Sequence, residues 1–227
     1  MTKVKICGIT NTEDIRICVN EGADALGFVI EYPVPVPWNL KVEEAKRLME
    51  AVPIFISKVA VVGDEFEKIM EIAEDLKPDA IQLHGNEPLD LTEKIISKMR
   101  SLKIKVIKAV RFSAETGEVI SEIKDPIELC KTLEKMKVDA ILLDSKTKDL
   151  PAGTGKTLDW KKAALIKDSV SVPIILAGGL RRENIRDAIL TVRPYAVDVI
   201  SGVEREKGKK DPVKVRDFIR EVHNAKI

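Results

Sequence analysis

Two residues at the ends of apolar, strand-like segments have the chemistry of a proton acceptor and a proton donor. Cys7 ends the segment Val4-Lys5-Ile6-Cys7, and Asp144 follows Ala140-Ile141-Leu142-Leu143. A free thiol ionises near pH 8.5 (a rough value), so Cys7 could serve as a nucleophile, a base or a metal ligand. Asp144 could act as a general acid if burial kept it protonated, or it could cap a helix or loop. A lone cysteine is also often inert core packing, so other parts of the chain must decide.

Two glycine-rich segments late in the chain suit a phosphate group. Ala177-Gly178-Gly179-Leu180 follows an apolar strand-like run, and Ser201-Gly202-Val203-Glu204 follows the last such run. Glycines let backbone N–H groups approach an anion, and the helix expected to begin near Arg182 adds partial positive charge. Together the two loops predict a phosphate site at Gly178, Gly179, Ser201 and Gly202, although either loop alone could simply be a tight turn.

A third glycine-rich segment, Gly153-Thr154-Gly155-Lys156-Thr157, matches the end of a nucleotide-binding P-loop pattern. The first glycine of that pattern is missing, because Leu150 stands in its place. We therefore expect an active-site loop that closes over the phosphate of the ligand, with Gly155 among the binding residues.

Polar residues interrupt three of the apolar runs. Asp198 lies within Ala-Val-Asp-Val-Ile, where an unpaired carboxylate would be costly. If the first and last strands adjoin, Lys5 is its expected ion-pair partner, with a structural role. Gln82 and His84 share one face of another strand, and we expect His84 to support the site rather than to catalyse.

Short β-branched runs recur eight times, separated by amphipathic stretches with helical spacing. The runs span residues 3–7, 25–30, 57–62, 80–84, 105–110, 140–144, 173–177 and 196–201. Strands that alternate with helices pair in parallel, since a parallel return needs a long crossover. The sequence predicts an α/β fold, a single-domain (β/α)8 TIM barrel over residues 1–227, with an open doubly wound sheet as the alternative. In a barrel the residues at the carboxyl ends of the strands form the active site.

The composition points to a small-molecule partner in a reducing compartment. The 227 residues are 44% hydrophobic and carry a formal net charge of +1, which favours neither nucleic acid nor an anionic membrane as a partner. The three cysteines, Cys7, Cys18 and Cys130, lack the spacing of a zinc site or a disulfide framework. With no leader and no membrane span expected, we predict a cytoplasmic protein, and its many Lys, Glu, Ile and Val residues suggest a thermophile.

Seven motifs, in order along the chain, closely resemble the phosphoribosylanthranilate isomerase family of tryptophan biosynthesis. They begin with Lys5-Ile6-Cys7-Gly8-Ile9-Thr10, Gly22-Ala23-Asp24-Ala25-Leu26-Gly27-Phe28, Gln82-Leu83-His84-Gly85 and Leu143-Asp144-Ser145-Lys146. They continue with the Gly153 to Trp160 segment, Ala177-Gly178-Gly179-Leu180, and Asp198-Val199-Ile200-Ser201-Gly202-Val203-Glu204. The resemblance runs from residue 3 to about residue 211, and the number and order of the motifs make it specific.

The resemblance implies an isomerase that converts N-(5-phosphoribosyl)anthranilate to the open-chain 1-deoxyribulose phosphate by an Amadori rearrangement, without metal or organic cofactor. The matching residues make Cys7 the general base and Asp144 the general acid. Such a division requires a thiol made easier to ionise and a carboxyl that holds its proton. Lys5, on the same strand face as Cys7, is expected to help stabilise the thiolate. Members of such families occur as monomers and homodimers, and both remain open.

One departure from the family concerns the substrate's anthranilate carboxylate. The family usually has an Arg after the second strand, and Trp38 stands at that position within Tyr32-Pro33-Val34-Pro35-Val36-Pro37-Trp38. Trp38 is expected to stack on the anthranilate ring, leaving the carboxylate to another cation such as Arg111 or Lys156. Two alternatives stay open: a related phosphoribosyl aminosugar isomerase of histidine biosynthesis, and a non-catalytic barrel that binds a phosphorylated ligand.

Overall fold

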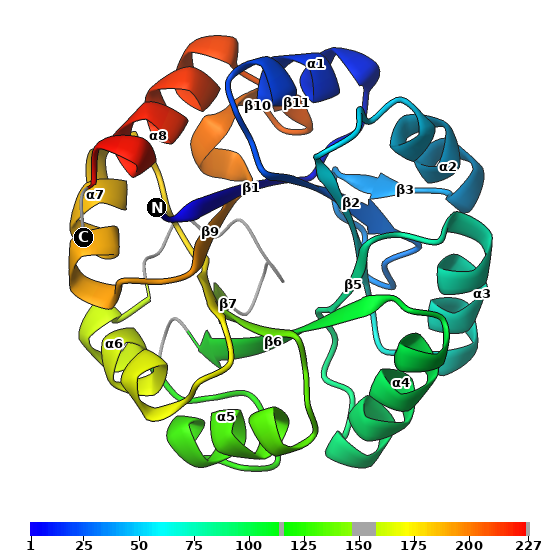
Figure 1. Ribbon diagram of the computed structural model, residues 1–227, viewed down its shortest axis with the longest axis vertical. Coiled ribbons are helices and arrows are strands. Elements are labelled where there is room, and N and C mark those ends of the chain that lie inside the picture. Colours follow the sequence, from blue (N-terminus) through cyan, green and yellow to red (C-terminus); the bar gives the residue numbers. More distant parts are fainter. Residues whose placement is uncertain (114–115, 147–157, 226–227) are drawn as a thin grey trace.

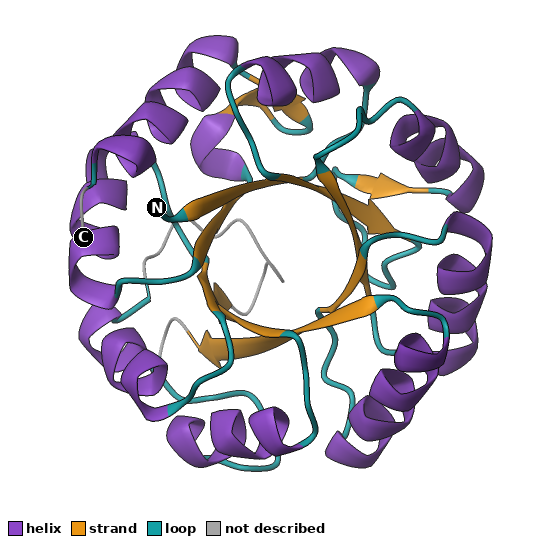
Figure 2. Ribbon diagram, in the orientation of Figure 1, coloured by secondary structure: helices purple, strands orange, loops and turns teal. Residues whose placement is uncertain are grey.

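The computed structural model describes residues 1–113, 116–146 and 158–225, which form a ring of parallel strands enclosed by helices (Figures 1 and 2). The barrel strands are β1 (Lys3–Cys7), β2 (Ala25–Ile30), β4 (Ser57–Val62), β5 (Ala80–Leu83), β6 (Lys105–Ser113), β7 (Ala140–Lys146), β8 (Ile174–Leu176) and β9 (Ala196–Val199). The helices are α1 (Thr12–Asn20), α2 (Val42–Glu50), α3 (Phe66–Leu76), α4 (Leu89–Ser101), α5 (Pro126–Lys135), α6 (Trp160–Ser169), α7 (Arg182–Val192) and α8 (Pro212–Asn224).

The sheet closes on itself, which confirms the predicted TIM barrel and excludes the alternative of an open doubly wound sheet. The strand order is β1-β9-β8-β7-β6-β5-β4-β2, and β1 also pairs in parallel with β2. This closure fixes the neighbours of the first strand: Lys5 is in register with Asp198 on β9, and Cys7 with Gly27 on β2. All eight predicted strands are present, within about three residues at their ends.

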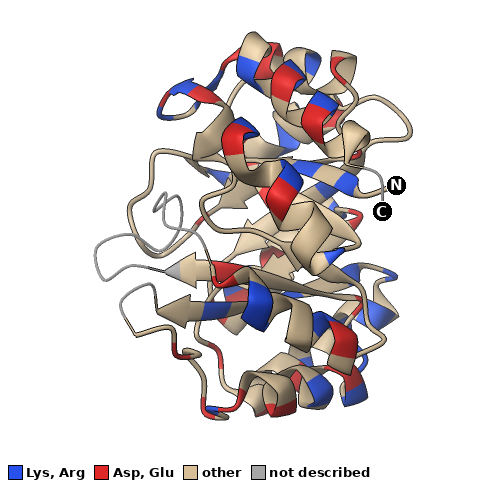
Figure 3. Cartoon of the chain, turned by 90° about the vertical axis from the view of Figure 1, so that its left-hand side faces the viewer, with Lys and Arg blue, Asp and Glu red and all other residues tan. Residues whose placement is uncertain are grey.

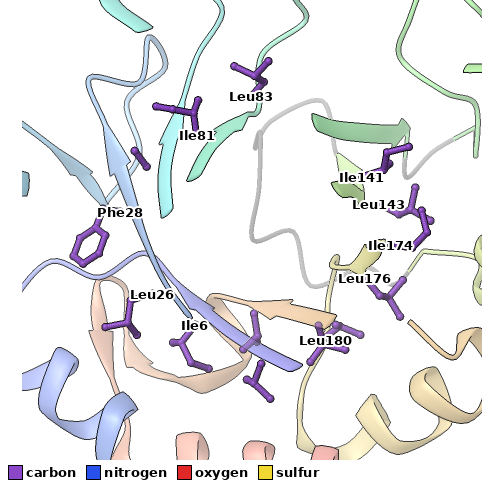
Figure 4. Packing of buried hydrophobic residues seen from close by; sticks show 14 of the residues in the cluster. Ile6, Leu26, Phe28, Ile81, Leu83, Ile141, Leu143, Ile174, Leu176 and Leu180 are labelled. Carbon is purple, nitrogen blue, oxygen red and sulfur yellow. The ribbon is translucent and has the colours of Figure 1, made fainter. Parts of the chain in front are cut away.

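Alternate residues of each strand face opposite sides of the barrel wall, and both sides are packed. Large apolar side chains such as Ile6, Phe28 and Leu143 lie on the outer side, toward the helices (Figure 4). The inner side is filled by a second apolar cluster, which includes Ala109, Ala140 and Leu142. Because the interior is packed in its middle and lower layers, a ligand can enter only at the carboxyl ends of the strands.

The helices begin where the sequence provides capping groups. Asn11 accepts a hydrogen bond from the backbone N–H of Asp14 at the start of α1, and Asp125 and Asp211 cap α5 and α8 ahead of a proline in the first turn. Charged side chains of both signs are interspersed along the helices, as expected from the near-zero net charge (Figure 3). No helix in these described ranges is long and apolar enough to cross a membrane.

Three short strands add to the barrel. β3 (Asn39–Leu40) pairs in parallel with the carboxyl end of β2 and fixes the chain that follows Trp38. β10 (Glu204–Glu206) and β11 (Lys209–Lys210) form an antiparallel hairpin after β9, preceded by the 3-10 turn η1 (Ser201–Val203). The sequence did not predict this hairpin, because Glu and Lys in short segments give no strand pattern.

Candidate active site

A pocket opens at the carboxyl ends of the strands and joins residues from most of the barrel. Its walls include the predicted site residues Cys7, Trp38, His84, Asp144, Gly178, Gly179 and Ser201. The lining also includes two further polar residues, Gln82 and Asp198, and two apolar ones, Leu180 and Val199. One side is largely apolar and is formed by Tyr32, Val29, Val36 and Val61. The pocket therefore brings together seven of the ten predicted residues from distant parts of the sequence.

Cys7 lies at the end of β1 beside a buried ion pair. The ammonium of Lys5 contacts both carboxylate oxygens of Asp198 at 3.0 Å, and both side chains are buried, which confirms the predicted internal pair. The Lys5 ammonium is also close enough to Cys7 to favour the thiolate electrostatically. A Cβ at Gly27, the register partner of Cys7, would lie 2.5 Å from Cys7 Sγ and 3.0 Å from Lys5 Nζ. Only glycine leaves room there for the thiol and the ammonium together.

Burial raises the pKa of the Cys7 thiol above its usual value, and this effect exceeds the opposing influence of the Lys5 ammonium. Asp198 adds to the rise. The expected contribution of Lys5 is therefore present, but the prediction that the site makes the thiol easier to ionise is wrong, because the pKa of Cys7 is raised. The reason is that desolvation disfavours the thiolate more than one partly neutralised ammonium favours it.

Asp144 lies at the end of β7, where its carboxylate faces the imidazole of His84. Asp144 Oδ1 accepts a hydrogen bond from the backbone N–H of Ser145 at 2.7 Å, and Oδ2 lies 3.5 Å from His84 Nε2. That second contact lacks hydrogen-bond geometry and is electrostatic only. The amide nitrogen of Gln82 lies 3.2 Å from His84 Nδ1, which places the ring proton on Nε2 when the amide donates. Gln82 and His84 thus share a face of the chain at β5, as predicted. His84 adjoins the carboxyl of Asp144, which lies on β7, two strands away.

The two glycine loops after β8 and β9 lie side by side. A Cβ on Gly202 would overlap the carbonyl oxygen of Leu180, so the loops are in direct contact. Gly178 has a φ of +83°, and a Cβ there would lie 2.7 Å from the hydroxyl of Ser145 and 3.1 Å from Asp144 Oδ1. In the described part of the chain, no backbone carbonyl accepts from the N–H groups of Gly178, Gly179, Ser201 or Gly202. These amides are available to an anion at the edge of the pocket.

Trp38 forms the wall opposite these loops, held by a buried network that the sequence did not reveal. Its indole Nε1 donates to Glu204 Oε1 at 2.6 Å. The same carboxylate oxygen accepts from Lys210 Nζ at 3.0 Å and from the backbone N–H of Gly208 at 3.2 Å. Lys210 is fully buried, although its charged segment has the sequence of an exposed turn. The sequence therefore gave no indication that this lysine belongs to the network behind Trp38.

Two predicted binding residues are not in the pocket wall, and one is not described. Arg111 is buried at the end of β6, where its guanidinium hydrogen-bonds to the side-chain oxygen of Asn86 and lies beside the Tyr32 hydroxyl. Gly202 lies behind Ser201 rather than on the wall itself. Gly155, together with Lys156, lies outside the described residues. The role of Arg111 in substrate binding stays a prediction, and its guanidinium lies beside Tyr32, which does line the pocket.

The described residues of the site include acid–base groups, and they provide no ligand set for a metal. Among the described residues no group of three or more His, Cys, Asp or Glu side chains is arranged to hold a metal ion. Tyr32 is a wall residue that the sequence reasoning did not single out, and its hydroxyl donates to the backbone carbonyl of His84 at 3.0 Å. The described pocket walls offer one thiol, the Asp144 carboxyl, the Asp198 carboxylate that is paired with Lys5, the imidazole of His84 and a set of loop amides.

Comparison with known proteins gives one consistent result. Residues 4–221 match the family model for N-(5'-phosphoribosyl)anthranilate (PRA) isomerase. The enzyme of that name from Methanopyrus kandleri is 40% identical over 224 residues, covering 97% of this chain and 98% of the relative. The one from Thermotoga maritima is 42% identical over 227 residues, covering 100% and 99%. Thermophiles among these sources agree with the composition.

Solved structures agree with the sequence relatives. The crystal structure of phosphoribosyl anthranilate isomerase from Thermotoga maritima has a TM-score of 0.81 at 40% identity, with 99% of this chain and 100% of that chain covered. A second isomerase structure, in complex with reduced 1-(o-carboxyphenylamino)-1-deoxyribulose 5-phosphate, has a TM-score of 0.77 at 37% identity, with 99% and 100% covered.

Proposed function

The chain belongs to the phosphoribosylanthranilate isomerase family and is an isomerase of tryptophan biosynthesis, and we propose that Cys7 is its general base and Asp144 its general acid. The observation that supports these roles is the pocket itself. It presents one thiol and one carboxyl at the ends of β1 and β7, and free loop amides at its edge. The substrate, N-(5-phosphoribosyl)anthranilate, needs an acid, a base and an anion site.

Ring opening is the step assigned to Asp144. The protonated carboxyl transfers its proton to the furanose ring oxygen, the C1–O bond breaks, and the nitrogen lone pair forms a Schiff base at C1. His84, 3.5 Å from the carboxyl, acts as a supporting residue. An imidazole with a proton on Nε2 can steady the carboxylate that remains after transfer.

Proton abstraction is the step assigned to Cys7. Its thiolate removes the proton from C2, the bonding electrons form the C1–C2 double bond, and the Schiff-base nitrogen recovers its lone pair. The resulting enolamine tautomerises to the ketone when its hydroxyl proton leaves and C1 gains a proton. Because burial raises the pKa of Cys7, ionisation must occur in the complex, where the cationic Schiff base and Lys5 both favour the thiolate.

The phosphate group is assigned to the paired loops after β8 and β9. Gly178, Gly179, Ser201 and Gly202 supply N–H groups, and α7 begins at Arg182 immediately behind the first loop. Oriented amides and a helix N-terminus together stabilise a dianion without a fixed lysine. Gly155, from the loop predicted to close over the phosphate, is proposed to add to this site.

Removal of either catalytic group tests the assignment. Cys7→Ala and Asp144→Asn should each lower kcat by about 100- to 10,000-fold with little effect on phosphate binding, because each removes one proton transfer. Cys18→Ala and Asp168→Asn change the same residue types outside the pocket and serve as controls. Turnover that survives in the double variant Cys7→Ala, Asp144→Asn would overturn the mechanism. A fluorescence assay of the anthranilate-bearing substrate follows the reaction.

For the assembly we propose a homodimer of single-domain subunits, each spanning residues 1–227, in the cytoplasm. A solved relative from Thermotoga maritima is described as dimeric. The support in this chain is the loop between α2 and β4, where Ile54 and Phe55 are 79% and 91% exposed. Phe55 holds a left-handed φ of +73°, an unfavourable conformation for a bulky residue in a loop with no partner. The loop lies at the end of the barrel opposite the pocket, so association leaves the site open.

A further inference from the structure

The hairpin of β10 and β11 buries a charge pair near the active site. Glu204 and Lys210 face each other across the two strands, and Lys210 Nζ lies 3.0 Å from Glu204 Oε1. Lys210 is fully buried, and Glu204 is 7% exposed. A buried pair of this kind gains little net stability, because desolvation offsets the attraction between the charges. The proton transfers assigned above use neither residue.

The carboxylate of Glu204 also holds Trp38. Glu204 Oε1 accepts a hydrogen bond from Trp38 Nε1 at 2.6 Å and one from the backbone N–H of Gly208 at 3.2 Å. The indole packs on the residue that follows Cys7, since a Cβ on Gly8 would lie 2.7 Å from Trp38 Cδ1. Trp38 and Cys7 also belong to one buried apolar cluster. Glu204 therefore fixes the ring that packs beside the base.

The hairpin is bound to the loop after β1 as well. The hydroxyl of Thr10 donates to the backbone carbonyl of Gly208 at 2.7 Å, and the backbone N–H of Lys210 donates to Asp14 Oδ1 at 3.1 Å. Asp14 is itself buried, and its Oδ2 accepts from Asn11 Nδ2 at 3.0 Å. In Figure 1 β10 and β11 lie beside α1. The hairpin thus contacts both the chain that follows the base and the tryptophan that packs on it.

Three charged groups from three strands act on the thiol of Cys7. They are Lys5 on β1, Asp198 on β9 and Lys210 on β11. Lys5 is paired with Asp198 at 3.0 Å, and Asp198 raises the pKa of the thiol. The buried ammonium of Lys210 lowers that pKa, as Lys5 does. A second cation therefore favours the thiolate from the hairpin.

We infer that the hairpin of β10 and β11 positions the general base: Lys210 supplies a second cation that acts on Cys7, and Glu204 holds this cation and Trp38 in place. Lys210 and Glu204 are positioning residues, because they act through Cys7 and Trp38. The inference rests on the proposed function, since it concerns the base of the same reaction.

The first test measures the pKa of Cys7 from the pH dependence of its alkylation by iodoacetamide. Lys210→Met should raise this pKa by roughly 0.5 unit or more, because it removes a cation and leaves the Glu204 carboxylate unpaired. The double variant Lys210→Met, Glu204→Gln removes both charges and keeps an oxygen that accepts from the indole. It should regain most of the Tm lost in the single variant and keep the raised pKa.

Two outcomes of this test would overturn the inference. One is a pKa of Cys7 that is unchanged in both variants. The other is a pKa that returns to the wild-type value together with Tm in the double variant, since recovery of both would show that Lys210 has a structural role only.

The neighbouring cross-strand pair of the same hairpin is a matched control. Lys209 and Glu206 lie 2.8 Å apart, but their side chains are 54% and 61% exposed. Lys209→Met and the double variant Lys209→Met, Glu206→Gln make the same changes in residue type and net charge. They should leave both the pKa of Cys7 and kcat unchanged, because water screens an exposed pair. A shift as large as that of Lys210→Met would overturn the assignment to Lys210.

The variant Trp38→Phe tests the second task of Glu204. It keeps an aromatic ring in the cluster and removes the N–H group that Glu204 holds, while both charges of the hairpin remain. We expect kcat to fall roughly 3- to 30-fold with the pKa of Cys7 unchanged, because the base is then less well positioned. A kcat equal to that of the wild type would overturn the role of Glu204 in holding Trp38.

The alkylation measurement does not require turnover, so it separates failure of this inference from failure of the proposed function. If Cys7→Ala retains full kcat, the assignment of the base is wrong, whatever the hairpin variants do to the thiol. If Cys7→Ala is inactive and the hairpin variants leave the thiol unchanged, the inference alone is overturned.

Discussion

The ion pair between Lys5 and Asp198 should control both the stability of the barrel and the ionisation of Cys7, and its two halves should act on the thiol in opposite directions. Lys5→Met removes the cation that lowers the pKa of Cys7, so that pKa should rise further. Asp198→Asn removes an anion that raises the pKa of Cys7 and leaves Lys5 without a countercharge, so that pKa should fall.

The size of the stability effect follows from the geometry. Opposite charges 3.0 Å apart interact by about 5 kcal/mol at an effective dielectric constant of roughly 20. Both side chains are buried, so removing one partner leaves a desolvated charge, which costs about 3–5 kcal/mol. For a chain of this size that corresponds to a fall in Tm of roughly 6–20 °C. The double variant Lys5→Met, Asp198→Asn removes both charges and should recover most of the loss.

The thiol can be followed by the pH dependence of its alkylation with iodoacetamide, with mass spectrometry to locate the label. Cys18 and Cys130 do not interfere, because burial raises the pKa of each to about 12. The single variants are compared with the wild type in the folded state, at a temperature well below the lowest Tm.

Two results would refute this reasoning. If both single variants moved the alkylation pKa in the same direction, Lys5 and Asp198 would not act on the sulfur through their charges. If the double variant were as unstable as the sum of the single variants, the pair would not be coupled. A shift of the kcat pH profile that parallels the alkylation pKa would further link the thiol to catalysis.

Three further predictions concern the packing of the site, the core thiols and the assembly. Gly27→Ala should lower kcat about 100-fold and destabilise the fold by about 1–3 kcal/mol, because its Cβ would displace Cys7 Sγ; in a Cys7→Ala background the stability loss, measured by urea unfolding, should shrink. The buried thiols Cys18 and Cys130 have pKa values raised from 9.0 to about 12, so their contribution to stability is complete below pH 9 and is lost as pH rises from 9 to 12. In that range each thiol should lower the free energy of unfolding by about 1.4 kcal/mol per pH unit. Between pH 8 and pH 10, the free energy of unfolding should therefore fall less in the double variant Cys18→Ala, Cys130→Ala than in the wild type. Phe55→Glu should yield monomers by light scattering with kcat retained, whereas Leu165→Glu, at another exposed apolar position, should not; dimers that persist would place the interface elsewhere.

The barrel could be predicted because its signal repeats. Eight β-branched runs separated by amphipathic segments leave few arrangements, and closure then fixes that β1 lies between β2 and β9. For the same reason the pairing of Lys5 with Asp198, 193 residues apart, followed from topology alone. The hairpin of β10 and β11 escaped prediction because its strands of two and three charged residues are defined by their contacts, not by a pattern.

The positions of the candidate site residues were predictable, and their electrostatics were less so. Strand ends identify Cys7, Asp144 and His84, because the fold gathers those positions at one face. The position of Arg111 was not predictable, since Asn86, from the loop after β5, engages its guanidinium. Nor was the raised pKa of Cys7, because the balance of burial against one shared ammonium depends on distances that the sequence does not contain.

Lys5 has to serve two partners, and this division explains how a buried thiol can be stable and still react. Its single positive charge is mostly neutralised by Asp198, so the effect of burial dominates and the pKa of the resting thiol is raised. In the proposed mechanism, the substrate's Schiff base brings a second positive charge into the pocket beside Cys7, and the balance shifts toward the thiolate only then. The base would thus be activated by the product of the acid step, which couples the two proton transfers in the order that the Amadori rearrangement requires.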